Sequence, residues 1–132
     1  MRINMSGIYV NDQEKALQFY TDTLGFQVKH DVPMGEFRWI TVVSREQPSG
    51  TELALEPDAH PAVKPYVAAL VKDGIPCMSF EVDDVAAEHQ RLESLGVRFT
   101  QAPKNVGGSM IAATFEDTVG NLIMITQGTF EG

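Results

Sequence analysis

Hydrophobic positions in the first half of the chain follow two different periods. After the polar run Asn11-Asp12-Gln13-Glu14, in which a capping residue is followed by a carboxylate, apolar residues return at helical spacing as far as Leu24. Gly25 then stands where a left-handed helix cap belongs, so the pattern predicts a helix over residues 12–24. Apolar runs around the turn-like segments Pro33-Met34-Gly35 and Gln47-Pro48-Ser49-Gly50 predict strands that end at residue 10 and that cover residues 26–30, 36–43 and 51–56.

The second half repeats this order of elements. The sequence predicts strands at residues 78–82, 97–100, 110–115 and 121–126, with a helix that starts at Asp83-Asp84 and ends before Gly96. Val10 matches Val82 at an offset of 72 residues, whereas Gly25 matches Gly96 at an offset of 71, so one gap separates the two alignments. Between the halves, apolar residues at helical spacing over 61–74 predict a connecting helix.

Two β-α-β-β-β units therefore fill the chain and predict a single α+β domain over residues 1–132. We place the first unit at residues 1–58, the connecting helix at 59–74 and the second unit at 75–128. A helix covers only one face of a four-stranded sheet, so the other face of each sheet needs a partner. We expect the two sheets, with mostly antiparallel strands, to form a half-open barrel with the helices outside and a small-molecule site on the concave side.

Composition and charge argue against two classes of partner. Eighteen acidic and ten basic residues give a formal net charge of −8, and no Lys/Arg cluster occurs, which argues against nucleic-acid binding. The longest apolar stretches are far shorter than the roughly 20 residues that cross a bilayer, so no membrane contact is expected. A start without an apolar signal segment and a single cysteine, Cys77, predict a protein of the reducing cytoplasm.

Several short motifs, spread over nearly the whole chain, carry a resemblance to a known family. They are Ile8-Tyr9-Val10-Asn11-Asp12, Ala16-Leu17-Gln18-Phe19-Tyr20, Leu24-Gly25-Phe26, Glu52-Leu53, Leu92-Glu93-Ser94-Leu95-Gly96-Val97 and Asp117-Thr118-Val119-Gly120-Asn121-Leu122-Ile123. In this combination the chain resembles the vicinal oxygen chelate superfamily of glyoxalases, bleomycin resistance proteins and extradiol dioxygenases. The resemblance implies the paired-unit fold and a homodimer.

The same resemblance implies where a metal would bind. Members with metal chemistry are expected to place ligands on the first and last strands of each unit, and those positions map to Met5, Glu52, Cys77 and Met124. Met5 and Cys77 lie 72 residues apart, as do Glu52 and Met124, which suggests two repeat-related pairs.

Alternation of side chains along the strands separates two faces of each sheet. One face is uniformly apolar and suits the helix side; it carries Leu53, Leu55, Phe80, Val82, Ile123 and Ile125. We expect the other, mixed face to line the ligand cavity with Met5, Tyr9, Trp39, Thr41, Glu52, Glu56, Cys77, Ser79, Glu81 and Met124. For Trp39, a wall on which a ligand stacks and a place in the core or a dimer interface are equally good interpretations.

The mapped positions are poor in metal ligands. Catalytic sites for divalent metals supply about three imidazole or carboxylate ligands, and only Glu52 is of this kind. Met5 and Met124 are thioethers, and Cys77 would have to lose its proton to bind zinc or iron. We therefore expect no metal cofactor, and a divalent metal bound by Glu52 and Cys77 is the alternative.

Glu52 is the candidate catalytic or ligand-binding residue, and three roles are open to it. It can hydrogen-bond a ligand or act as general base, it can pair with Arg38 or another basic side chain, or it can face water. The histidines do not occupy mapped positions. We expect His30 and His60 at the surface or in loops and His89 within the second helix.

These observations favour a protein that binds a small molecule without the usual metal site. The acidic face and the net charge of −8 favour a neutral or cationic ligand. The alternative is a divalent-metal-dependent glyoxalase-like lyase or isomerase, or a dioxygenase, with an atypical ligand set. A Gly-rich phosphate loop, a nucleophile elbow and paired cysteines are all absent from the sequence, so no other chemistry is indicated.

Overall fold

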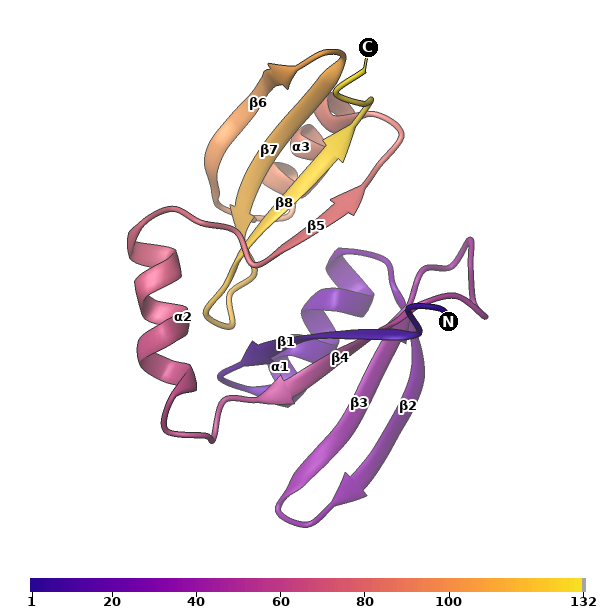
Figure 1. The fold of residues 1–132 in the computed structure, drawn as a ribbon, viewed down its shortest axis with the longest axis vertical. Coiled ribbons are helices and arrows are strands. Elements are labelled where there is room, and N and C mark those ends of the chain that lie inside the picture. The colour runs from indigo at the N-terminus through magenta and orange to yellow at the C-terminus, as the bar shows by residue number, and fades with distance from the viewer. Residues whose placement is uncertain (132) are drawn as a thin grey trace. The chain divides into compact units, whose positions relative to one another are not determined.

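Each half of the chain folds into one four-stranded sheet with a helix against one face (Figure 1). The computed structural model describes residues 1–131. The elements of the first half are β1 (Met5–Val10), α1 (Gln13–Gln18), the π-helical segment η1 (Phe19–Thr23), β2 (Gln27–Met34), β3 (Phe37–Val43) and β4 (Glu52–Pro57). Those that follow are α2 (Val63–Lys72), β5 (Met78–Glu81), α3 (Val85–Ser94), β6 (Phe99–Gly107), β7 (Met110–Glu116) and β8 (Leu122–Gln127).

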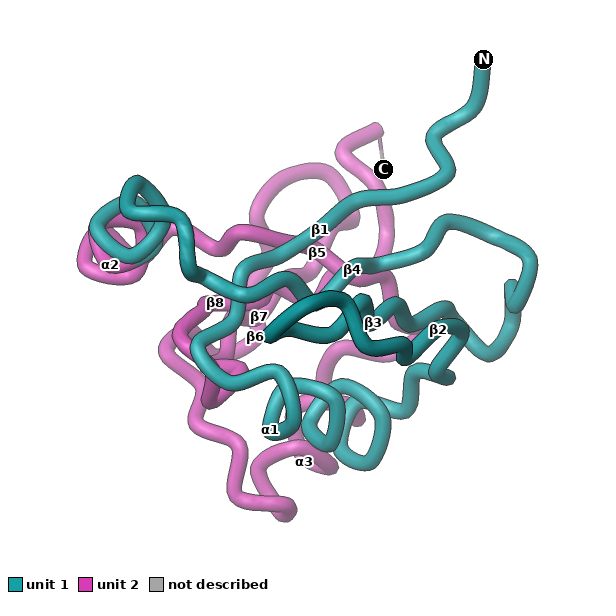
Figure 2. The backbone as a smooth tube through the Cα atoms, turned by 90° about the horizontal axis from the view of Figure 1, so that it is seen from below, with its two compact units in different colours: residues 1–67 teal, residues 68–132 magenta. Residues whose placement is uncertain are grey.

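The chain divides into two compact units, residues 1–67 and residues 68–132, coloured separately in Figure 2. The boundary falls inside α2, which is the predicted connecting helix. None of the helices within residues 1–131 combines the length and the apolar character needed to span a membrane.

Strand order is the same in both units: β1-β4-β3-β2 in unit 1 and β5-β8-β7-β6 in unit 2. The first and last strands of each unit are parallel neighbours, and the other neighbours are antiparallel. The predicted α+β fold of two β-α-β-β-β repeats is therefore confirmed. The half-open barrel and the single-domain boundaries stay predictions.

The predicted apolar faces are the ones that the helices cover. In unit 1, α1 contacts β3 and β4, and Leu53 and Leu55 are buried. In unit 2, α3 contacts β6, β7 and β8, and Ile123 and Ile125 are buried. Burial of these side chains stabilises each helix on its sheet, because removing apolar surface from water contributes roughly 25 cal/mol per Å².

Aspartates cap both helices in the same way. Asp12 accepts a hydrogen bond from the Lys15 backbone N–H, and Asp84 accepts one from Ala87. Such side chains satisfy a free N–H group in the first helical turn, which explains why both helices begin where the sequence predicts.

The first helix contains one residue more than the second, and η1 accommodates it. The Leu24 N–H bonds the carbonyl of Phe19, five residues earlier, which widens the last turn. Phe19 and Tyr20 are both buried there. Gly25, with φ +91°, then ends the helix. This extra residue explains why the two halves align at an offset of 72 before the helix and of 71 after it.

Two predicted turns are shorter than the sequence suggested. β2 continues through Pro33 and Met34, which pair with Arg38 and Phe37, so the turn itself is only Gly35 and its neighbour. Pro33 is tolerated because β2 is an edge strand and its missing N–H faces away from β3. Likewise β6 covers Phe99–Gly107, which shortens the connection between the strands predicted at residues 97–100 and 110–115.

Candidate functional site

The candidate site lies on the face of the first sheet that α1 does not cover, which we call the first open face. Strand pairing places Met5, Gly7 and Tyr9 of β1 beside Glu52, Ala54 and Glu56 of β4 on this face. Met5 is 45% exposed and Tyr9 is 40% exposed, whereas Ile8, between them in sequence, is buried on the helix side. The alternation that predicted a mixed face is thus present in unit 1.

Glu52 occupies the centre of a small polar cluster on the first open face. The Thr41 hydroxyl donates a 2.8 Å hydrogen bond to Glu52 Oε1, and Thr41 itself is fully buried. Lys29 Nζ lies 3.9 Å from Glu52 Oε2, and His30 Nε2 lies 3.7 Å from Glu52 Oε1. The Glu52 side chain keeps 24% of its surface exposed, so the carboxylate faces solvent between two basic groups.

A β-bulge in β2 delivers both basic side chains to this cluster. Val28 pairs with Val42 and His30 pairs with Thr41, so β2 contains one extra residue, Lys29, at this point. A bulge breaks the alternation of faces and turns two consecutive side chains to one side. His30 therefore lies beside Glu52, and it is exposed, as the sequence predicted. His60 does lie in a loop, where its Nδ1 accepts the Ala62 N–H.

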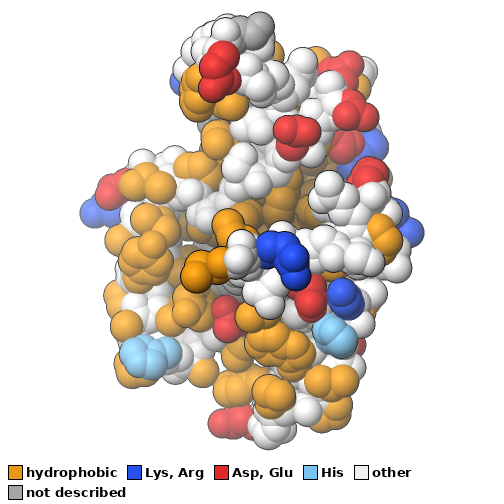
Figure 3. All heavy atoms as spheres, turned by 45° about the vertical axis from the view of Figure 1, so that its right-hand side comes forward, with side chains coloured by type: hydrophobic (Ala, Val, Ile, Leu, Met, Phe, Trp, Pro, Cys, Tyr) orange, Lys and Arg blue, Asp and Glu red, His pale blue; other side chains and the backbone are white. Residues whose placement is uncertain are grey.

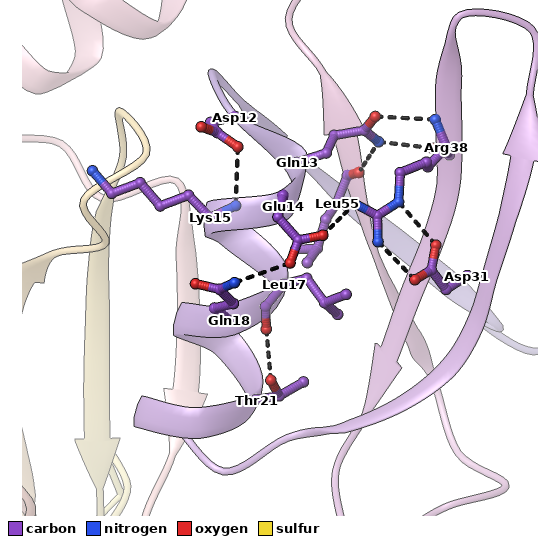
Figure 4. Close-up of polar contacts among 10 residues, drawn as sticks. All are labelled: Asp12, Gln13, Glu14, Lys15, Leu17, Gln18, Thr21, Asp31, Arg38 and Leu55. Atoms are coloured by element: carbon purple, nitrogen blue, oxygen red, sulfur yellow. Dashed lines mark hydrogen bonds and ion pairs between the residues drawn. The ribbon is translucent and has the colours of Figure 1, made fainter.

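Arg38 is not the partner of Glu52; of the predicted pairing with Arg38 or another basic side chain, the structure has the second alternative, with Lys29 as the partner. The Arg38 guanidinium donates to Asp31 at 3.0 and 2.7 Å and to Glu14 at 2.7 Å, on the helix side of the sheet (Figure 4). The hydrogen bonds from Arg38 lower the pKa of Asp31 from its ordinary value. Arg38 shares the strand parity of the buried Ile40, and this parity places it on the α1 side.

A second acidic group, Glu56, lies on the same face of β4, four residues from Glu52. The carboxylate of Glu56 lies directly over Gly7, where the Cβ of any other residue would collide with it. Glu56 pairs in register with Tyr9. Trp39 of β3 is half-buried and points to this face, because it shares the parity of Thr41.

In unit 2 the predicted cavity residues lie on the face opposite α3. Ser79 pairs with Met124 and Glu81 pairs with Thr126. Cys77 precedes β5, and its N–H bonds the Leu122 carbonyl. Burial, followed by the negative charge of Asp117, raises the pKa of the Cys77 thiol to about 11, so this thiol stays protonated at neutral pH.

Strand register does not preserve the two repeat-related pairs inferred from the offset of 72. Met5 lies directly opposite Glu52, whereas Cys77 lies beside Leu122 and Met124 lies opposite Ser79. In unit 2 the residue placed like Glu52 is therefore Leu122, two positions before Met124. A shift of two residues keeps the same face of the sheet, so the predicted face assignment is unaffected.

The donors present do not fit a divalent metal. Within residues 1–131, no group of three His, Cys, Asp or Glu side chains is close enough to hold an ion. At Glu52 the other candidate ligand is His30, and the Lys29 ammonium would repel a cation there. Met124 offers only a thioether, which zinc and iron do not favour.

Exposed apolar side chains lie on the same face as the polar cluster of unit 1. In the lower part of Figure 3, acidic, basic and histidine side chains lie next to one another within a largely hydrophobic surface. A polar group set among apolar side chains is the usual composition of a small-molecule site. The exposed apolar residues that strand pairing assigns to the first open face are Met5, Tyr9, Val32, Met34 and Phe37.

Comparison with known proteins matches the chain over nearly its whole length. The family model described as Glyoxalase/Bleomycin resistance protein/Dioxygenase superfamily matches residues 2–125. The uncharacterized protein YurT of Bacillus subtilis (strain 168) is 50% identical over 127 residues, which cover 96% of this chain and 99% of YurT.

Two solved structures are similar in both sequence and fold. The crystal structure of UcmS2 is 30% identical with a TM-score of 0.83, and the match covers 97% of this chain and 98% of that one. TnmS3, an antibiotic binding protein from Streptomyces sp. CB03234, is 32% identical with a TM-score of 0.78, and the match covers 98% of this chain and 97% of TnmS3.

Proposed function

Since this chain belongs to the Glyoxalase/Bleomycin resistance protein/Dioxygenase superfamily, we propose that it binds a small organic molecule through Glu52, without a divalent metal. The proposal rests on the orientation of the Glu52 carboxylate and on its distances to the neighbouring basic groups. The carboxylate is oriented by Thr41 and half-buried, yet both neighbouring basic groups lie beyond hydrogen-bond distance. A ligand donor group can therefore bind the carboxylate without first breaking a short ion pair.

The surroundings of Glu52 support an organic ligand. Exposed apolar side chains, including Met5 and Tyr9, offer surface that a ligand can remove from water. Lys29 and His30 can donate to an acceptor of the same ligand. TnmS3, a similar structure, is an antibiotic binding protein, which supports a ligand of drug-like size.

The charge of the chain bears on the kind of ligand. A formal net charge of −8 favours the approach of neutral or cationic molecules over anions. The homodimer implied by the family belongs to this proposal as well. Light scattering that gives a mass near twice 14.5 kDa would support it.

Fluorescence of Trp39 provides a direct binding test, because it is the only tryptophan in the chain. We would titrate a panel of aromatic amines, phenols and carboxylic acids, with Glu52→Gln as the test variant and Glu46→Gln, in an exposed loop, as its control. Compounds that bind should lose about tenfold or more in affinity with Glu52→Gln, because a charge-assisted hydrogen bond is lost. Glu46→Gln should leave their affinity unchanged.

Two results would overturn the proposal. One is tight binding restricted to anions with no response to Glu52→Gln. The other is a stoichiometric divalent metal in protein purified without chelator, found by elemental analysis, since the proposed binding uses none.

A further inference from the structure

The ladder between β3 and β4 stops after two residue pairs, although both strands continue. Only Thr41 with Ala54 and Val42 with Leu53 are in register. Beyond them β3 stays paired with β2 and β4 stays paired with β1, so the sheet divides into two ribbons that diverge in Figure 1. The backbone groups exposed at this division need partners, because unpaired buried polar groups are costly.

The side chain of Gln13 supplies those partners. From the first turn of α1, its Nε2 donates to the carbonyl of Arg38 at 2.7 Å and to the carbonyl of Leu55 at 2.9 Å. Its Oε1 accepts the Arg38 N–H at 3.1 Å (Figure 4). One amide thus takes the place of a strand-to-strand hydrogen bond and keeps the two ribbons apart by its own width.

On the opposite side of this division lie three chemically matched side chains. Trp39 of β3 shares the strand parity of Thr41 and Glu56 of β4 shares that of Ala54, so both lie on the open face, on either side of the gap in the ladder. On its other side, Glu56 pairs in register with Tyr9. A carboxylate on the same face as two aromatic rings is suited to a planar cation, which stacks on a ring and donates to the oxygens.

We infer that Gln13 is a positioning residue that sets the spacing between Trp39 and Glu56, and that these two side chains take a planar cationic group of the ligand. The inference rests on the proposed function, because it concerns a second contact on the same open face. It names the ligand class as an aromatic or conjugated molecule that carries an amidinium, a guanidinium or a protonated aromatic amine.

Benzamidinium and benzamide make a suitable pair of probes, because they are planar, similar in shape and different in charge. Titration of Trp39 fluorescence should show that the full chain binds benzamidinium about tenfold more tightly than benzamide. Glu56→Gln should abolish this preference. Gln13→Val should reduce it to less than about threefold, because the division narrows when the amide is lost.

Matched variants separate positioning from stability. Gln18→Val makes the same substitution on the same helix, at an exposed side chain that donates to Glu14, and should keep the preference. If Gln13→Val does not fold, as judged by circular dichroism, then Gln13→Met, which keeps the length but not the amide, replaces it. The ratio of the two dissociation constants is a readout that a general loss of stability would not move.

Each outcome decides the inference. Equal affinity for the two probes, or a preference unchanged by Glu56→Gln or by both Gln13 variants, overturns it. The proposed function survives that result if other compounds still bind in a manner that depends on Glu52. If no compound of the wider panel binds either, both proposals fail.

Discussion

The two units have the same strand order, and one position after the helix cap accounts for much of their difference. Asp12 and Asp84 cap the helices identically, but the next residue is Gln13 in unit 1 and Val85 in unit 2. The Gln13 amide stands between β3 and β4. Val85 is fully buried, and the pairing of β7 with β8 continues unbroken from Ile111 with Gln127 to Glu116 with Leu122.

The connections between the last two strands of each unit also differ. In unit 2 a tight turn joins β7 to β8, closed by the buried carboxylate of Asp117, which accepts from the Val119 and Asn121 backbone N–H groups and from the Asn121 amide. In unit 1 the corresponding loop, residues 44–51, is long and mostly exposed. The β7–β8 ladder of unit 2 is therefore longer than the β3–β4 ladder of unit 1, which stops where the open face carries polar groups.

The largest effect should come from removing the carboxylate that closes the turn between β7 and β8. Asp117→Ala leaves buried backbone N–H groups without an acceptor and should lower the free energy of unfolding by about 3 kcal/mol, measured by urea denaturation. Asp117→Asn keeps one acceptor oxygen and should lose less. Asp73→Ala, at an exposed position, is the control, and a loss below about 1 kcal/mol for Asp117→Ala would contradict this account.

A smaller effect should follow from giving unit 2 the residue of unit 1. Val85→Gln buries an amide beside the β7–β8 ladder, whose backbone groups already bond one another and leave the amide without a partner. We therefore expect a loss of about 2 kcal/mol in the free energy of unfolding. Val85→Met, similar in length but apolar, should lose less. Equal stability of the two variants in urea would show that the β7–β8 ladder can open as β3 and β4 do.

The smallest effect concerns the thiol of unit 2. With its pKa raised from 9.0 to about 11, Cys77 in the native protein should react with iodoacetamide at pH 8 at least about tenfold more slowly than in urea, as followed by mass spectrometry. The same shift makes stability depend on pH. Above pH 9 the thiol of the unfolded chain loses its proton while the native thiol keeps it, so the free energy of unfolding should fall between pH 9 and 11. Equal alkylation rates in both states would contradict the burial of this thiol.

Local signals in the sequence were enough to predict the order of elements. Helical spacing, aspartate caps and glycine stops act within a few residues, so both helices and all eight strands were expected. The difference between the two repeat offsets, 72 before the helix and 71 after it, already indicated one extra residue in the first helix. The hydrogen bond from the Leu24 N–H to the Phe19 carbonyl shows where that residue lies.

The site was harder to predict because its contacts are long-range. Gln13 bonds residues 25 and 42 positions away, and nothing near it in sequence indicates those partners. The bulge at Lys29 depends on how β2 meets β3, so strict alternation missed His30. The helix-side position of Arg38 could have been predicted, because Arg38 has the same strand parity as Ile40, which lies under the helix.

The bulge at Lys29 also has a consequence for how this surface can change over time. β2 has a neighbour on one side only, so an inserted or deleted residue there disturbs a single ladder and leaves the pairing of β3 with β4 untouched. A change of length by one residue would exchange which side chains face Glu52 while the buried core keeps its composition. Insertions and deletions in this edge strand therefore offer a short mutational route to a new ligand preference.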